Sequence, residues 1–414
     1  MYTTGLDFDV ERVRDLSQSQ AIKWDISPRL YSSRLSSYIP KSPKHRAAAT
    51  ETSQPPTSII SRIPSVTVPH PTSSMGFSQP RIPDLPEVVL TGQTVIVTGA
   101  TGGIGRELAV QILRRQAALV ILPVRSLIAG SATRLEILGD ELVRKQNPGG
   151  KVRIEELDLA DQQSVVNFAN RVRQTERRLD LVILNAGINL ARFQLSPSGH
   201  EMCMQVNLIS NALLSLLLLP LIQETARQQR PAGGASPTIT LVGSMGQAFN
   251  SLAAKPLAPA AEILPLYASA AAYSGIHRYP DTKLFVSLFA RQLAAHVERE
   301  QGQVTVNTVC PGTVKTGADN NLPAWLRVPM NVNRALRGRS VEDGARAILW
   351  AALCRAANEE GSENGLYYAN NEVTEIAPFA QTTGQAAAFE KKLWDEIFAE
   401  AKKADETIGK GLRA

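Results

Sequence analysis

The chain has 414 residues, of which 43% are hydrophobic and 20% charged, a balance typical of a globular protein with a sizeable core. The segment between Ser27 and Pro83 holds seven basic residues and one acidic residue, so the whole net charge of +6 lies there and argues against nucleic acid as a ligand of the remainder. The three cysteines, Cys203, Cys310 and Cys354, are widely spaced, which predicts no disulfide framework, no metal site and a reducing compartment.

Residues 1–85 are dominated by Ser, Pro and Thr and predict a disordered basic tail, because such a composition buries too little apolar surface to offset chain entropy. We expect one folded domain over residues 86–414. No apolar stretch near the start resembles a secretory signal, so we expect a cytoplasmic protein. Import into an organelle through the tail is the alternative, although several acidic residues near the start do not suit a transit peptide.

From Val88 onward, short apolar runs alternate with amphipathic helical patterns, which predicts an α/β fold with one doubly wound parallel sheet and helices on both faces. A leucine-rich run at residues 213–219 is too short to span a bilayer, so we expect a buried helix and no integral membrane segment. The expected strands are 94–98, 118–122, 151–157, 179–184, 238–242, 304–309 and 366–369. The expected helices are 107–115, 131–145, 161–174, 199–222, 280–300, 341–354 and 386–403.

A glycine-rich turn follows the first expected strand and opens into a helix. Glycines let a backbone turn tightly and let a pyrophosphate approach closely, and a helix N-terminus offers N–H groups to phosphate. The turn therefore predicts a dinucleotide site, with a turn that merely packs strand against helix as the alternative. The residues expected to contact the cofactor here are Thr98, Gly99, Thr101, Gly103, Ile104 and Gly105.

Ligands of open parallel sheets bind at the carboxyl ends of the strands. Arg125 follows the second strand, where an acidic residue would favour NAD and a cation suits the 2′-phosphate of NADP, so we expect NADP (NADPH). Asp158 and Leu159 follow the third strand and could reach an adenine edge, and Ser244 follows the fifth. The other strand ends that we assign to the cofactor carry Asn185, Ala186, Gly187, Pro311, Gly312 and Thr313.

Tyr279 and Lys283 are four residues apart and share one face of an expected helix. A lysine ammonium one turn away stabilises a phenolate, which suits the tyrosine for acid/base work. This pair is weak evidence alone, but here it follows a strand that ends in a serine, within a dinucleotide-binding pattern.

These motifs, in this order, resemble a short-chain dehydrogenase/reductase of the classical type, with a Rossmann-type fold, over about residues 90–370. The retinol-dehydrogenase-like branch and reductases of secondary metabolism are the most similar in pattern. The resemblance implies that Ser244 orients a carbonyl, Tyr279 is the acid/base and Lys283 holds the nicotinamide ribose. It further implies that Asn207 holds a water that relays protons to Lys283. Tyr279 and Lys283 would thus also contact the cofactor.

We therefore expect an NADP-dependent oxidoreductase that interconverts a carbonyl and a primary or secondary alcohol on a small, largely apolar substrate. A retinoid-like or steroid-like molecule, or an intermediate of secondary metabolism, would fit. A non-catalytic NADP-binding regulator or scaffold on the same fold is the alternative. The Ala- and Pro-rich insert at residues 247–278 is expected to form part of the substrate wall. Apolar helices around residues 213 and 285 favour a homodimer, with burial inside the monomer as the alternative.

Overall fold

The computed structural model describes residues 79–85, 87–229, 236–300, 302–317, 322–353, 364–379 and 383–409. Residues 1–78, nearly all of the expected tail, lie outside the described residues, and so does Cys354.

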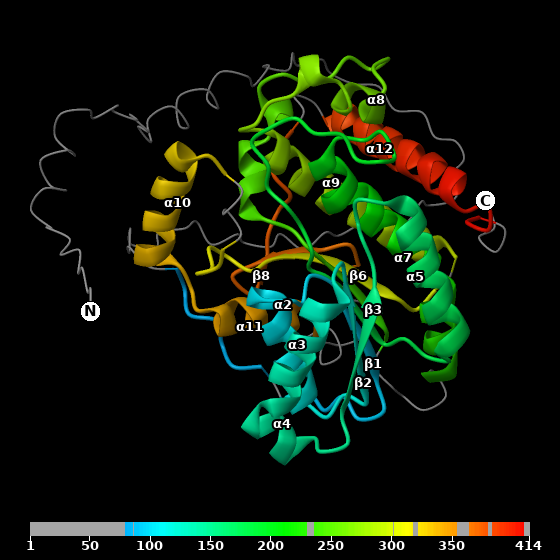
Figure 1. Ribbon diagram of the computed structural model, residues 1–414. Coiled ribbons are helices and arrows are strands. Elements are labelled where there is room, and N and C mark those ends of the chain that lie inside the picture. The colour runs from blue at the N-terminus through cyan, green and yellow to red at the C-terminus, as the bar shows by residue number, and fades with distance from the viewer. Residues whose placement is uncertain are drawn as a thin grey trace, which may run out of the picture. The chain divides into compact units, whose positions relative to one another are not determined.

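One eight-stranded sheet forms the centre of the domain, in the order β3-β2-β1-β4-β5-β6-β7-β8 (Figure 1). All neighbouring strands are parallel except β7 and β8. The chain reverses its direction of travel across the sheet between β1 and β4, and such a switch point is where open α/β sheets bind ligands. The strands are β1 (Thr94–Val97), β2 (Leu119–Val124), β3 (Lys151–Glu156), β4 (Leu181–Leu184), β5 (Thr238–Val242), β6 (Thr305–Cys310), β7 (Tyr367–Ala369) and β8 (Glu372–Val373).

Helices cover both faces of the sheet, as the alternating pattern predicts (Figure 1). One core lies between the sheet and α2 (Gly103–Arg114), α4 (Glu141–Gln146) and α11 (Val341–Leu353). The other lies under α5 (Gln162–Thr175), α7 (Ser210–Gln229) and α9 (Arg278–Arg299). The helix α12 (Thr383–Ala404) packs outside α9 and α7. The fold class expected from the sequence is therefore confirmed.

The expected strands lie within about two residues of the observed ones, but two helices differ. The helix expected at 131–145 is two helices, α3 (Leu127–Gly139) and α4, because Asp140 leaves the helical conformation at ψ 129° and its carboxylate accepts a hydrogen bond from Val143 N. The helix α8 (Ile263–Tyr267) lies in the insert. The helix α10 (Ala324–Arg337) was not predicted at all.

The helix expected at 199–222 begins later, runs further and contains a π-helical turn. Met202–Met204 (α6) leads into the turn at Gln205–Ile209 and then into α7. The combined helix Met202–Gln229 has 28 residues and is long and apolar enough to cross a membrane, but 89% of its most apolar window is buried in the fold. Among the described residues it alone passes that test, and its burial is that of a core helix.

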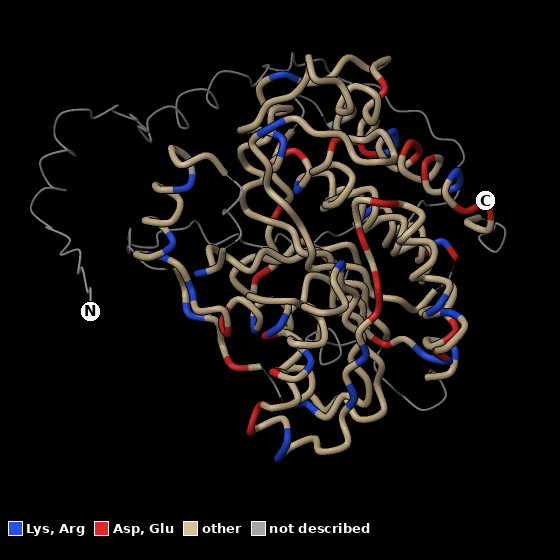
Figure 2. Tube along the Cα trace, in the orientation of Figure 1, with Lys and Arg blue, Asp and Glu red and all other residues tan. Residues whose placement is uncertain are grey.

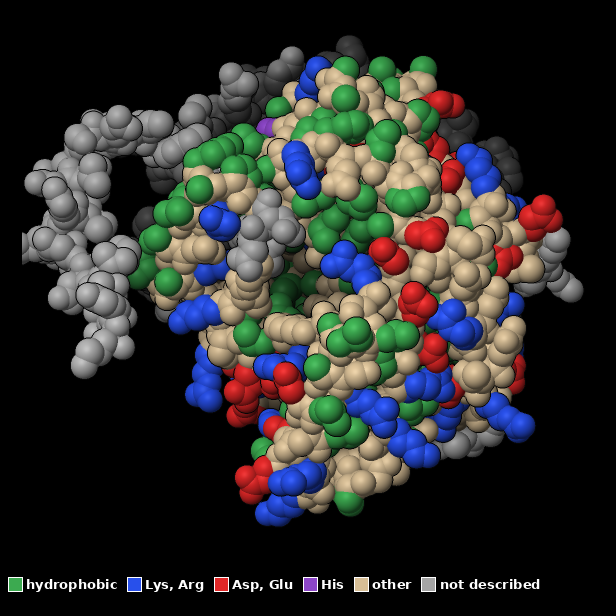
Figure 3. Space-filling model, viewed as in Figure 1, with side chains coloured by type: hydrophobic (Ala, Val, Ile, Leu, Met, Phe, Trp, Pro, Cys, Tyr) green, Lys and Arg blue, Asp and Glu red, His purple; other side chains and the backbone are tan. Residues whose placement is uncertain are grey.

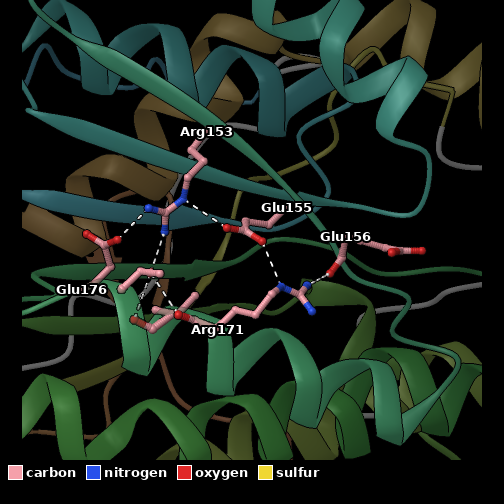
Figure 4. A network of polar contacts seen from close by, with 7 residues as sticks. Arg153, Glu155, Glu156, Arg171 and Glu176 are labelled. Carbon is pink, nitrogen blue, oxygen red and sulfur yellow. Dashed lines mark hydrogen bonds and ion pairs between the residues drawn. The ribbon is translucent and has the colours of Figure 1, made fainter.

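Strand β3 forms one edge of the sheet and carries a network of ion pairs (Figure 4). Arg153 lies between Glu155, at 3.2 Å, and Glu176, at 2.6 Å. Arg171 of α5 bonds the carboxylate of Glu155 and the carbonyl oxygen of Glu156. Charged side chains along an edge strand discourage pairing with another chain. Elsewhere along the described chain, basic and acidic positions are intermixed in the view of Figure 2.

The described residues ahead of position 86 pack against the domain. Ile82 is only 1% exposed, and Asp84 lies 3.3 Å from Arg346 of α11. The carboxamide of Gln79 hydrogen-bonds the loop after β6. Contacts with the core thus begin before the boundary that composition suggests.

Candidate active site

A cavity of ≈ 1180 Å³ opens at the carboxyl ends of β1, β4, β5 and β6. The space-filling view shows a hollow with apolar side chains at its floor, beside α10 (Figure 3). Thirteen of the residues expected at the site line the cavity. They are Gly99, Thr101, Gly103, Ile104, Gly105, Asn185, Gly187, Ser244, Tyr279, Lys283, Pro311, Gly312 and Thr313.

Two glycines of the glycine loop (residues 98–105), Gly99 and Gly105, are packed so closely that side chains would not fit there. A Cβ atom on Gly105 would lie 2.3 Å from the carbonyl oxygen of Gly99, and one on Gly99 would lie 2.9 Å from the Cα of Ala186. The hydroxyl of Thr98 accepts a hydrogen bond from Ala186 N, and Asn185 Nδ2 donates to Thr98 O. These bonds lock the loop to the end of β4 and leave a backbone cradle at the start of α2. Such a cradle fits the pyrophosphate of a dinucleotide.

Ser244 and Tyr279 meet at one point beside this cradle. A Cβ atom built on Gly246 would lie 3.1 Å from Ser244 Oγ and 3.9 Å from Tyr279 Cε1, so both side chains border the same small space. Ser244 begins a 3₁₀ turn, and its hydroxyl accepts a hydrogen bond from Gly246 N at 3.0 Å. That bond fixes the serine oxygen and leaves its proton free to be donated elsewhere.

Lys283 lies one turn along α9 from Tyr279, with its ammonium 5.6 Å from the centre of the tyrosine ring. The lysine is 4% exposed, and its Nζ donates to the carbonyl oxygen of Val242 at 2.7 Å. Burial lowers the pKa of this lysine to about 8, while the nearby Cys310 and Cys203 act in the opposite direction. The ammonium is thus held in place by the end of β5, at the wall of the cavity.

Asn207 lies directly behind Lys283, inside the π-helical turn. A Cβ atom on Gly187 would lie 3.2 Å from Asn207 Oδ1 and 3.4 Å from Lys283 Nζ, so the glycine separates the two side chains only narrowly. Asn207 Oδ1 accepts from Ile188 N, and its Nδ2 donates to Ile188 O and to Thr282. Single π turns within α-helices are frequent at functional sites. Here the turn sets the asparagine against the loop after β4.

A buried ion pair between Arg278 and Glu201 lies at the first turn of α9. Arg278 and Glu201 are 2% and 0% exposed, with Arg278 Nε 3.6 Å from Glu201 Oε2. The guanidinium lies over the ring of Tyr267 at 4.4 Å and over that of Tyr273 at 5.3 Å. Burial raises the pKa of Glu201, although Arg278 opposes the change. This cluster joins the insert to the segment that presents the catalytic candidates.

The two tyrosines of the insert are held by packing and hydrogen bonds. The hydroxyl of Tyr267 donates to Asp281 and that of Tyr273 to Leu190 O. Burial raises the pKa of Tyr273 to about 12. His200 lies against Glu400 of α12, away from the cavity-lining residues. The insert reaches the cavity through Ala248, Phe249, Gly275 and Ile276.

Five of the expected cofactor residues, Thr98, Arg125, Asp158, Leu159 and Ala186, do not line the cavity. Arg125 is exposed at the end of β2, and Arg106 at the start of α2 pairs with Glu136 of α3. Asp158 caps the turn after β3 by accepting a hydrogen bond from Ala160 N, and Leu159 is buried behind it, with its carbonyl oxygen bonded by Ser210. None of these residues therefore lies at the corner of the cavity with Tyr279.

Sequence reasoning missed two parts of the site. Met330, Asn333, Arg334 and Arg337 of α10 line the cavity, and so do Gln79 and Pro80. The helical spacing of the apolar residues Trp325, Val328, Val332 and Leu336 could have revealed α10, although all four are exposed. No local pattern marks Gln79, whose partners lie more than 200 residues away. Among the described residues, no group of three His, Cys, Asp or Glu could hold a metal ion.

Comparison with known proteins places this geometry in a family. A family model described as short chain dehydrogenase matches residues 93–234. The chain is 37% identical over 329 residues to the short chain dehydrogenase yanD of Aspergillus niger, covering 79% of this chain and 96% of that protein. It is 36% identical to the short chain dehydrogenase sor7 of Hypocrea jecorina, with 74% and 83% covered.

Solved structures agree with the fold. An uncharacterized protein from Mycobacterium paratuberculosis superposes with a TM-score of 0.53 at 22% identity, covering 78% of this chain and 98% of that one. The RhlG protein of Pseudomonas aeruginosa, solved as an NADP active-site complex, gives 0.50 at 22% identity, with 69% and 97% covered. The chain belongs to the short-chain dehydrogenase/reductase family, oxidoreductases that act on CH–OH groups with a nicotinamide nucleotide.

Proposed function

We propose that the protein is an NADP-dependent oxidoreductase that interconverts a carbonyl and a primary or secondary alcohol on a small, largely apolar substrate. The observation that carries the proposal is the convergence of Ser244, Tyr279 and Lys283 on the cavity that the glycine cradle lines, with Asn207 beside Lys283 across Gly187. When bound, the nicotinamide supplies or accepts the hydride. The chain must then meet the charge that develops on the substrate oxygen.

Each of these side chains has one task in the proposal. The Tyr279 hydroxyl gives a proton to the substrate oxygen during reduction and takes it back during oxidation. Ser244 Oγ, fixed by Gly246 N, donates to the same oxygen and stabilises its charge. Lys283 holds the cofactor ribose and places a positive charge beside the phenol, and Asn207 holds a proton-relay water. In this proposal the residues that hold the cofactor are those of the glycine loop, with Asn185, Ala186, Gly187 and residues 311–313.

The substrate class is proposed from the cavity wall. Among the lining residues, Met245, Phe249 and Ile276 are large apolar side chains that remain more than half exposed. Exposed apolar surface at a cavity indicates an apolar ligand. A retinoid-like, steroid-like or secondary-metabolite intermediate has the required chemistry.

The test is turnover of a panel of apolar ketones, aldehydes and alcohols by wild type and Tyr279→Phe. The variant should bind NADPH normally and lose turnover by several orders of magnitude. Tyr273→Phe is the matched control, because that phenol is bonded to Leu190 O and should leave turnover nearly unchanged. If wild type binds NADPH but turns over nothing in the panel, the alternative gains support, namely a non-catalytic NADP-binding regulator. Retained activity in Tyr279→Phe would refute the acid/base role.

The preference for NADP is proposed from Arg125 and from Arg106 at the start of α2. We expect NADPH to bind more tightly than NADH through one or two charge-assisted bonds, each worth about 1.5–3 kcal/mol. Arg125→Ala should therefore weaken NADPH binding at least about tenfold and leave NADH binding unchanged. Equal loss for both cofactors, measured by fluorescence titration, would contradict this role. Glu136→Gln, which frees Arg106, should strengthen NADPH binding.

Assembly and location remain proposals as well. The side chains that favoured a homodimer, among them Leu213 and Phe285, are buried within the single chain, which supports burial inside the monomer instead. Sedimentation at micromolar concentration decides between the two. A cytoplasmic location remains our proposal, with import through the N-terminal segment as the alternative.

A further inference from the structure

A short segment ahead of the catalytic domain reaches the cavity at the loop after β6 and the end of α10. Gln79 Nε2 donates to Thr313 O at 2.7 Å and to Arg337 O at 2.8 Å. Gln79 Oε1 accepts from Thr313 N at 2.9 Å. One carboxamide thus bonds both backbone groups of Thr313, in the loop after β6, and the last carbonyl of α10.

The loop after β6 is shaped to receive this side chain. Gly312 has φ +82°, and a Cβ atom on it would lie 2.4 Å from Gln79 Oε1 and 2.5 Å from Arg339 Nη1. The same arginine donates to Pro311 O and to Pro80 O, which gives the segment a second anchor one residue away. Gly312 has no side chain, and atoms of Gln79 and Arg339 occupy the space that a side chain there would need.

These bonds join two walls of the cavity. Pro311, Gly312, Thr313 and Thr316 line it from the loop after β6, and four residues of α10 line it from the helix. Gln79 bridges the two walls directly, from Thr313 to Arg337. Gln79, which belongs to no helix or strand, therefore helps to set the distance between the loop after β6 and α10.

We propose that Gln79 is a positioning residue that fixes the loop after β6 against the end of α10 and so sets the width of the cavity between the cofactor-holding residues 311–313 and α10. The kinetic consequence rests on the proposed function, whereas the structural consequence does not. Without the carboxamide, the loop and helix separate more easily and hold cofactor and substrate less well. Chemistry at Tyr279 is left intact, because no bond of Gln79 reaches Tyr279, Ser244 or Lys283.

The experiment compares Gln79→Ala, Gln79→Glu and the control Arg81→Ala, whose exposed side chain belongs to the same segment, all in the full chain. Amide hydrogen exchange in peptides covering residues 311–317 should accelerate about tenfold in both Gln79 variants and not in the control. The KM for NADPH and the KM for substrate should each rise about tenfold while kcat changes less than about twofold. Gln79→Glu separates hydrogen bonding from bulk, because it keeps the size but replaces the donating nitrogen with a second acceptor oxygen that faces the carbonyl oxygens of Thr313 and Arg337.

Unchanged exchange and KM in Gln79→Ala would overturn the proposal, and so would wild-type behaviour of Gln79→Glu. Equal losses in the Arg81 control would also overturn it, since they would indicate general loosening of the segment. If wild type turns over no substrate, the proposed function fails, and the exchange rates alone decide whether Gln79 positions the loop.

Discussion

Burial of Lys283 in the candidate active site should make the free energy of unfolding depend measurably on pH. The pKa of Lys283 falls from 10.5 to about 8 in the folded chain because burial disfavours its charged form. At 1.36 kcal/mol per unit, this corresponds to about 3 kcal/mol. Between these two pKa values the unfolded chain binds more protons than the folded chain, so stability rises with pH. The free-energy cost of burying the charged lysine is fully present below pH 8 and is absent above the pKa of the unfolded lysine.

Lys283→Met removes the titrating group and keeps a side chain of similar length. As the pH rises from neutral to the unfolded pKa of 10.5, the free energy of unfolding of wild type should increase by about 3 kcal/mol relative to that of the variant. The methionine also leaves Val242 O without its donor, which costs stability by an amount that does not vary with pH.

Urea unfolding of the cofactor-free protein at several pH values measures the difference. Lys391→Met is the matched control, because that side chain is 73% exposed and should run parallel to wild type throughout. Parallel curves for wild type and Lys283→Met would refute the reasoning, since they would mean that the lysine pays no penalty for burial.

Two further outcomes are expected. Glu201→Ala should destabilise the protein by about 3–5 kcal/mol, because it leaves the Arg278 guanidinium buried without its partner carboxylate. Denaturant unfolding measures the loss. A loss below about 1 kcal/mol would show that the ion pair contributes little to stability. Deleting residues 1–78 should leave the melting temperature nearly unchanged, whereas deleting 1–84 should lower it because Ile82 is lost from the core; equal melting temperatures for the two truncations would contradict this.

Most of the fold could be predicted because its signals are local. Strands such as β5 are short apolar runs in a chain that alternates with amphipathic helices, and their order along the sheet follows from connection rules. The failures have physical causes. Asp140 caps a second helix in the middle of an otherwise continuous pattern. The apolar stripe of α10 faces outward and Pro329 interrupts its sequence, so it does not read as a core helix.

The candidate site could be predicted where strand ends carry the chemistry, as with Ser244. Gln79 could not, because its role depends on partners such as Thr313, 234 residues away in the sequence. The π-helical turn around Asn207 could not be predicted either, because its residues have ordinary helical character. What distinguishes the turn is the hydrogen bond that Asn207 makes to the loop after β4, which is distant in the sequence.

The outer helix α12 has a consequence for how the chain folds as it is made. Trp394 of this helix stacks on Phe289 of α9, and Phe389 packs against Phe285. Both phenylalanines are made about a hundred residues before the end of α12, which at ribosomal rates is on the order of 5–20 s. During that interval Phe285 and Phe289 lack the aromatic partners that α12 provides in the finished fold. The rings of α9 therefore reach their final packing only after the last helix of the described chain has been made.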